Sequence, residues 1–110
     1  MPKFVTIGYG DQAGYDRTSA AVRDAAHDQD RKLRSTGALI GISGPAVQVR
    51  NPEAAGLVTV DGPYMTSALP VAGFAIIEAV DLADAIRKVA QVPCAVAHGV
   101  VEVWPLIEAV

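Results

Sequence analysis

Two residues of this 110-residue sequence have the chemistry for proton transfer, and each lies in a segment that can fix its position. His27 falls within a helical pattern at residues 16–36, and an imidazole has an unperturbed pKa of about 6.5, which suits acid/base work near neutrality. Asp61 follows the apolar segment 56–60 and begins an Asp-Gly-Pro sequence. A carboxylate at the end of a strand can orient and stabilise a protonated imidazole. We therefore predict that Asp61 and His27 form an acid/base pair.

Both residues also have a purely structural interpretation, and this alternative stays open. Asp-Gly-Pro is ordinary turn chemistry, because the aspartate bonds nearby amides, the glycine relaxes the backbone and the proline has no N–H group. A lone histidine on a helix is often solvated or hydrogen-bonded locally. His98, in a predicted loop, is a weaker candidate than His27 for a functional role.

Polar residues in two loops are predicted to line the mouth of a small-molecule pocket. They are Tyr9 and Asp11 before the first helix, and Tyr64 and Ser67 after the Asp-Gly-Pro sequence. The segment 8–13, GYGDQA, resembles a dinucleotide-binding turn, but the strand at 38–43 ends without the acidic residue that such a site requires. We therefore expect a site that uses no cofactor.

Composition limits the classes of partner. The chain suits one domain spanning residues 1–110, carries a formal net charge of −3 and has no basic run, which argues against nucleic acid and anionic membrane as partners. One cysteine and two histidines give neither a disulfide within the chain nor a zinc site. The N-terminal segment lacks the long apolar run of a signal peptide or membrane helix, so the expected location is cytoplasmic.

The hydrophobic pattern predicts an α+β sandwich in which two helices cover one face of an antiparallel sheet. Strand 72–80 is apolar on both faces apart from Glu78, so the helix-free face of the sheet should be apolar too, and a homodimer would cover it. The expected elements are strands 3–9, 38–43, 72–80 and 99–105, a hairpin of 46–50 with 56–60, a loop at 10–15, a helix at 16–36, and a helix capped by Asp81 and ended by Pro93. Asp16 or Thr18 is expected to cap the helix at 16–36, and Asp30 and Arg34 are expected to form an i,i+4 ion pair on it.

Several segments resemble the YCII-related, or DGPF-domain, family over nearly the whole chain. They are YGDQ at 9–12, STGALIG at 35–41, VTVDGPY at 58–64, AGFAIIEAVDLADAI at 72–86 and GVVEVWPL at 99–106. The resemblance implies a ferredoxin-like fold that forms a dimer of the dimeric α/β-barrel type. It also implies an acid/base pair, with the aspartate at Asp61 and the histidine near His27. One branch is similar to lyases that remove chloride from hydroxylated aromatics, and the DGPF branch is associated with sigma-factor genes.

The sequence departs from the family pattern at the motif phenylalanine, which is Tyr64, and at a last-strand arginine, which is Trp104. His27 also lies one residue from the usual position. We predict a small-molecule-binding, cofactor-free enzyme of lyase type. The alternative is a non-catalytic accessory or protein-interaction domain, related to sigma-factor regulation, that binds through its sheet face and the loop at 64–70.

Overall fold

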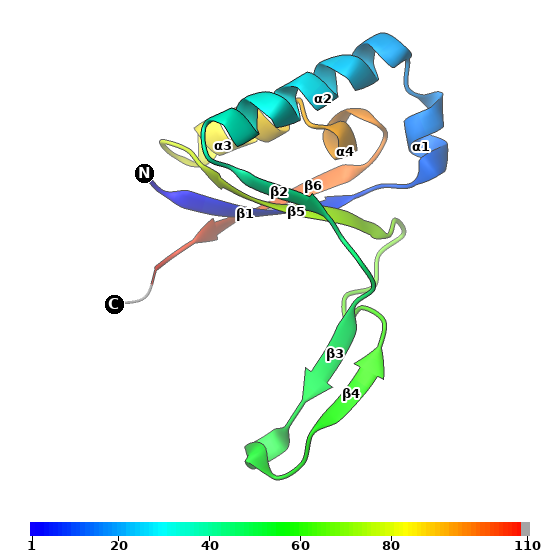
Figure 1. The fold of residues 1–110 in the computed structure, drawn as a ribbon, viewed down its shortest axis with the longest axis vertical. Helices are drawn as coiled ribbons and strands as arrows, with labels where there is room; N and C mark the ends of the chain where they lie inside the picture. The colour runs from blue at the N-terminus through cyan, green and yellow to red at the C-terminus, as the bar shows by residue number, and fades with distance from the viewer. Residues whose placement is uncertain (109–110) are drawn as a thin grey trace.

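A computed structural model describes residues 1–108, and a four-stranded antiparallel sheet is its framework (Figure 1). The strand order is β2-β5-β1-β6. β1 pairs with both β5 and β6, and Ile7 lies opposite Phe74 and Glu102. The α+β, ferredoxin-like class expected from the sequence is confirmed. The bounds are β1 Lys3–Tyr9, β2 Leu39–Ile42, β5 Val71–Glu78 and β6 Val100–Leu106.

The helices all lie on one side of this sheet (Figure 1). α2 is the long one and begins where the Ser19 side chain accepts a hydrogen bond from the Val22 amide. It ends before Gly37, whose φ of 102° suits the left-handed position after a helix. Asp81 caps α3 as expected from the sequence. The bounds are α1 Gln12–Arg17, α2 Ala20–Ser35, α3 Leu82–Val89 and α4 Pro93–Val96.

The structure corrects three of the expected helix boundaries. Residues 10–15 were expected to be a loop, yet α1 begins there because the Asp11 side chain accepts a hydrogen bond of 2.8 Å from the Gly14 amide. Pro93 begins α4 instead of ending α3, because the first position of a helix needs no N–H donor. The cap of α2 is Ser19 and not Asp16 or Thr18.

A separate two-stranded hairpin, which we call the arm, extends from the sheet on the side away from the helices (Figure 1). It consists of β3 Val47–Arg50 and β4 Val58–Asp61, joined through a 3₁₀ turn at Pro52–Ala54. The hairpin expected from the alternation of residues is confirmed. A two-stranded hairpin that packs against nothing else is at best marginally stable in water. The arm is therefore a candidate for stabilisation by contacts with a partner.

The core lies between the sheet and α3, where the start of β1 pairs with the end of β5. Ile77 is only 1% exposed and packs with Phe4, Ala79, Ala85 and Val89. The opposite, helix-free face of the sheet is exposed and mostly apolar, with Lys3, Glu78 and Glu102 as its charged residues, and no element of residues 1–108 covers it. Its large exposed side chains are Leu39, Phe74, Ile76, Val100, Trp104 and Leu106.

Candidate functional site

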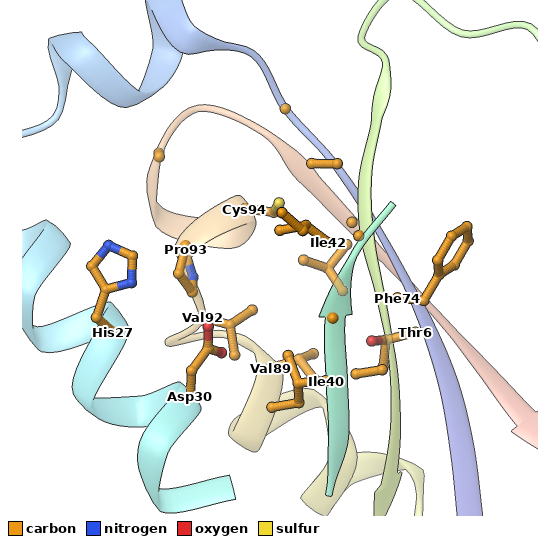
Figure 2. Close-up of a pocket in the computed structure, with 18 of the residues that line it drawn as sticks. Thr6, His27, Asp30, Ile40, Ile42, Phe74, Val89, Val92, Pro93 and Cys94 are labelled. Carbon is orange, nitrogen blue, oxygen red and sulfur yellow. The ribbon is translucent and has the colours of Figure 1, made fainter. Parts of the chain in front are cut away.

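A cavity of about 470 Å³ lies between the helices and the helix-covered face of the sheet (Figure 2). Its size is within the range of small-molecule sites, and such sites combine apolar walls with a few polar groups. The walls here are largely aliphatic, and the lining residues come from all four α-helices and from all four strands of the main sheet. The main apolar residues are Leu33, Ile40, Ile42, Val89, Val92 and Val101.

Glycines on β1 and just after it give this cavity its shape at the α4 end. A Cβ atom at Gly8 would lie 2.9 Å from the Cys94 Sγ, which is closer than van der Waals contact allows. A Cβ atom at Gly10 would lie 3.7 Å from the same sulfur. The absence of a side chain at Gly8 therefore lets α4 bring Cys94 against β1 and into the cavity wall.

Asp30 places a carboxylate in this apolar space. It lies on the face of α2 that also carries the buried Ala26 and Leu33, at helical spacings of four and three residues. Burial raises the pKa of Asp30, while the positive charges of Arg34 and His27 act in the opposite direction and are weaker. Figure 2 shows the Asp30 carboxylate directed toward Val92 and Pro93. A desolvated carboxylate of this kind is suited to accept a proton.

His27 lines the same cavity one turn earlier on α2. Its Nε2 is 3.1 Å from the Tyr15 hydroxyl, a hydrogen bond that joins α2 to α1. The Arg23 guanidinium lies 4.7 Å from the centroid of the Tyr15 ring, a cation–π contact that also helps to hold this ring. The imidazole is therefore positioned by Tyr15 within this chain.

Thr6 and Cys94 are two further polar residues that line the cavity, beside Asp11, Gln12 and Arg34. Thr6 faces it from β1 and is 5% exposed. Burial raises the pKa of the Cys94 thiol, and the negative charge of Asp30 adds to that effect. The thiol is therefore protonated and weakly nucleophilic at neutral pH. Among residues 1–108, no three histidine, cysteine, aspartate or glutamate side chains gather into a metal site.

The structure separates the residues predicted from the sequence. Of the six, His27 and Asp11 line the cavity. Asp61 ends β4 on the arm, opposite Val47 in the ladder, and it is exposed and on the other side of the sheet from His27 (Figure 1). The Asp61–His27 pair therefore stays a prediction that requires a second copy of the chain.

The other three predicted binding residues also lie away from the cavity. The Tyr9 hydroxyl donates a 2.5 Å hydrogen bond to Glu102, and this bond is the main reason that the pKa of Tyr9 is raised. Tyr64 is exposed and lies near Arg50, whose guanidinium is 5.7 Å from the centroid of its ring. The Ser67 hydroxyl donates to the Leu69 carbonyl within its own loop.

Asp30 is the candidate site residue that the sequence did not predict. The acid was assigned to a solvated i,i+4 pair with Arg34, and no such ion pair is found among residues 1–108. The signal was present, because Asp30 falls within the stripe that contains Ala26 and Leu33. Tyr15 was missed because residues 10–15 were expected to be a loop.

We expect Asp30→Asn to stabilise the unliganded protein at neutral pH by a few degrees in melting temperature, because it removes a desolvated charge. The raised pKa means that the folded state binds the Asp30 proton more tightly than the unfolded state does. The free energy of unfolding therefore falls as pH rises from the unfolded pKa through the raised folded value. Thermal unfolding from pH 4 to 8 should show the variant's advantage growing with pH. A variant that is less stable at pH 7 would contradict this assignment.

Comparison with known proteins connects this fold to a family. The model of the YCII-related domain matches residues 2–109. No curated protein matches the sequence. Among residues 1–108, no helix has the length and hydropathy needed to cross a bilayer. Because the family model covers nearly all of the chain, the protein belongs to the YCII-related domain family.

Proposed function

We propose that this protein binds a small organic molecule in the cavity beside α2 and transfers a proton with Asp30 and His27. The observation that carries the proposal is the position of these two side chains. They come from adjacent turns of one helix and line the same largely apolar space (Figure 2). Carboxylate and imidazole are the commonest proton-transfer groups. Their electrostatic interactions with a substrate are stronger in a low-dielectric site than in water.

The chemistry that fits best is elimination without a cofactor. Asp30 removes a proton from a carbon atom, and the electron pair of that C–H bond forms a double bond as the leaving group departs. The protonated form of His27, held by Tyr15, gives its proton to the departing group. The raised pKa of Asp30 makes its ionised form a stronger base than an exposed carboxylate.

Proton removal is testable without knowing the substrate. We expect the protein to catalyse the exchange of the acidic C–H protons of small cyclic ketones for deuterium in D₂O. The rate of exchange can be measured from the loss of the NMR signals of these protons. Asp30→Asn should reduce the protein-dependent rate at least about 100-fold, because general-base catalysis contributes on that order. Asp28→Asn is the matched control, since Asp28 is on the same helix but exposed and paired with Arg31.

Two results of this exchange experiment would contradict parts of the proposal. Exchange no faster than in buffer for every ketone, or full retention of exchange in Asp30→Asn, would overturn the proton-transfer function. If Asp61→Asn instead reduced the exchange rate as much as is expected for Asp30→Asn, the base would be Asp61 on the arm of a second copy of the chain. That outcome is the one required by the pair predicted from the sequence.

We also propose that two copies of the chain associate through the helix-free face of the sheet. That face exposes several large apolar side chains, among them Phe74, Ile76 and Trp104. Patches of this kind usually mark interaction sites. The arm lies on the same side of the sheet (Figure 1), and its Val47, Val49 and Val58 side chains are more than half exposed. A second copy on this face would cover both.

A non-catalytic interaction domain is the second candidate function, and the arm is the observation that favours it. If the arm binds a different protein, such as a regulator that acts with a sigma factor, the cavity needs no ligand. The two candidates differ in the exchange experiment. An interaction domain gives no protein-dependent exchange and no difference between Asp30→Asn and Asp28→Asn.

A further inference from the structure

We propose that Thr6 is the specificity-determining anchor of the cavity, and that the ligand is an uncharged, mainly hydrocarbon molecule with an acceptor for Thr6 and a donor for Asp30. This inference rests on the proposed function, because it names the class of molecule that the same cavity takes. It adds a residue, Thr6, to which the proposed function assigns no role.

Thr6 is an unusual residue for its position. β1 directs Phe4, Thr6 and Gly8 toward the helices, and Phe4 is part of the core. Valine has the same shape as threonine and would fill this position without placing a hydroxyl group in an apolar region. Burying a hydroxyl without a partner costs about 1–3 kcal/mol. A buried threonine here therefore needs a hydrogen-bond partner.

The protein does not provide that partner. The side-chain hydrogen bonds formed within residues 1–108 include neither the Thr6 hydroxyl nor the Asp30 carboxylate, and both residues line the cavity. In the described part of the chain, no side-chain nitrogen or oxygen atom is both fully inaccessible and without a hydrogen-bond partner. Because the Thr6 hydroxyl has no such partner, its oxygen must be accessible from the cavity. Figure 2 places its oxygen on the cavity side of the sheet. A ligand in the cavity can supply the missing bond.

The positions of the two groups define the ligand. Thr6 is on the sheet and Asp30 on α2, so they belong to opposite walls with aliphatic side chains between them (Figure 2). The charged lining residues are Asp11 and Asp30 against Arg34 and the titratable His27. Charges of both signs at one cavity give no preference for an ionic ligand. A neutral molecule with polar groups at opposite ends fits this arrangement.

Three matched probes test the inference. 4-Hydroxycyclohexanone carries both an acceptor and a donor, cyclohexanone only the acceptor, and methylcyclohexane neither. Their affinities can be measured from amide chemical-shift titrations of the ¹⁵N-labelled protein, with Gly8 and Gly41 as reporters at the cavity. We expect 4-hydroxycyclohexanone to bind about tenfold more tightly than cyclohexanone, because each net hydrogen bond contributes on the order of 1 kcal/mol.

Variants of Thr6 separate the anchor from the rest of the cavity. Thr6→Val should reduce the affinity for both ketones about tenfold and leave the affinity for methylcyclohexane unchanged. Thr6→Ser keeps the hydroxyl and should retain the preference for the ketones over methylcyclohexane. Unequal effects of Thr6→Val on the ketones and methylcyclohexane therefore support the anchor. Equal affinities of all three probes, or unchanged ketone binding in Thr6→Val, would overturn it. Failure of all three probes to bind would overturn the proposed function as well.

Stability of the unliganded protein gives a second readout. Thr18 is the matched control, because it is 7% exposed and its hydroxyl donates a 2.9 Å hydrogen bond to the Gly14 carbonyl. Thr18→Val should lower the melting temperature, since it leaves a buried carbonyl unpaired. Thr6→Val should leave the melting temperature unchanged or raise it. A decrease equal to that of Thr18→Val would mean that Thr6 bonds within the protein, and would contradict the anchor.

Discussion

Phe74→Glu should convert the proposed dimer into a monomer at micromolar concentration. Phe74 lies near the middle of β5 on the helix-free face, and half of its side-chain surface is exposed in the single chain. In a two-fold symmetric dimer the substitution places one unpaired carboxylate on each side of the interface. Desolvating such charges costs several kcal/mol. We therefore expect the dissociation constant to rise at least about 100-fold, measured by sedimentation equilibrium.

A matched control distinguishes the interface from a general effect of charge. Ile86 on α3 is 51% exposed, against 50% for Phe74, but it is on the helical side of the sheet. Ile86→Glu should leave the dimer intact. A wild-type protein that sediments as a monomer at micromolar concentration would defeat the proposed dimer, and equal weakening by both variants would place the interface elsewhere.

The fold was largely predictable because its strongest signals are local. The apolar run of β5, the Asp81 cap of α3 and the left-handed glycine at position 37 each specify an element without tertiary information. The short helices were not predictable in the same way. α1 depends on a cap at Asp11 in a glycine-rich segment, and the sequence around Pro93 is compatible with ending one helix or beginning another.

The candidate site was less predictable because it depends on distances between elements. Asp61 and His27 have the right chemistry, but the arm carries Asp61 to the opposite side of the sheet. Asp30 was assigned to the solvated face because a nearby arginine gave it an apparent partner. The stripe of Ala26 and Leu33 places Asp30 on the covered side of α2, but the cavity beside it also depends on the packing of α4 against α2, which the sequence of α2 alone does not specify.

Gly99→Ala should destabilise the protein by roughly 3 kcal/mol, the upper part of the usual range for overpacking. A Cβ atom at Gly99 would collide with the Tyr9 carbonyl oxygen and would lie 2.6 Å from that of Cys94. Both oxygens belong to the backbone, so neither can rotate away. The start of β6 and α4 would have to move away from β1, and the cavity wall at Cys94 would move with them. Thermal unfolding should show a decrease of more than about 10 °C.

The effect of Gly99→Ala can be separated from the general effect of adding a methyl group to a glycine. Gly41 also lines the cavity, but a Cβ atom there would meet nothing within 4 Å. Gly41→Ala should therefore change stability by no more than about 0.5 kcal/mol. Because Cys94 is the single cysteine, its rate of modification by a thiol reagent reports on this wall directly. Gly99→Ala should accelerate modification and Gly41→Ala should not. A Gly99→Ala protein with wild-type melting temperature and thiol reactivity would show that the close contact between α4 and β1 does not hold the cavity in place.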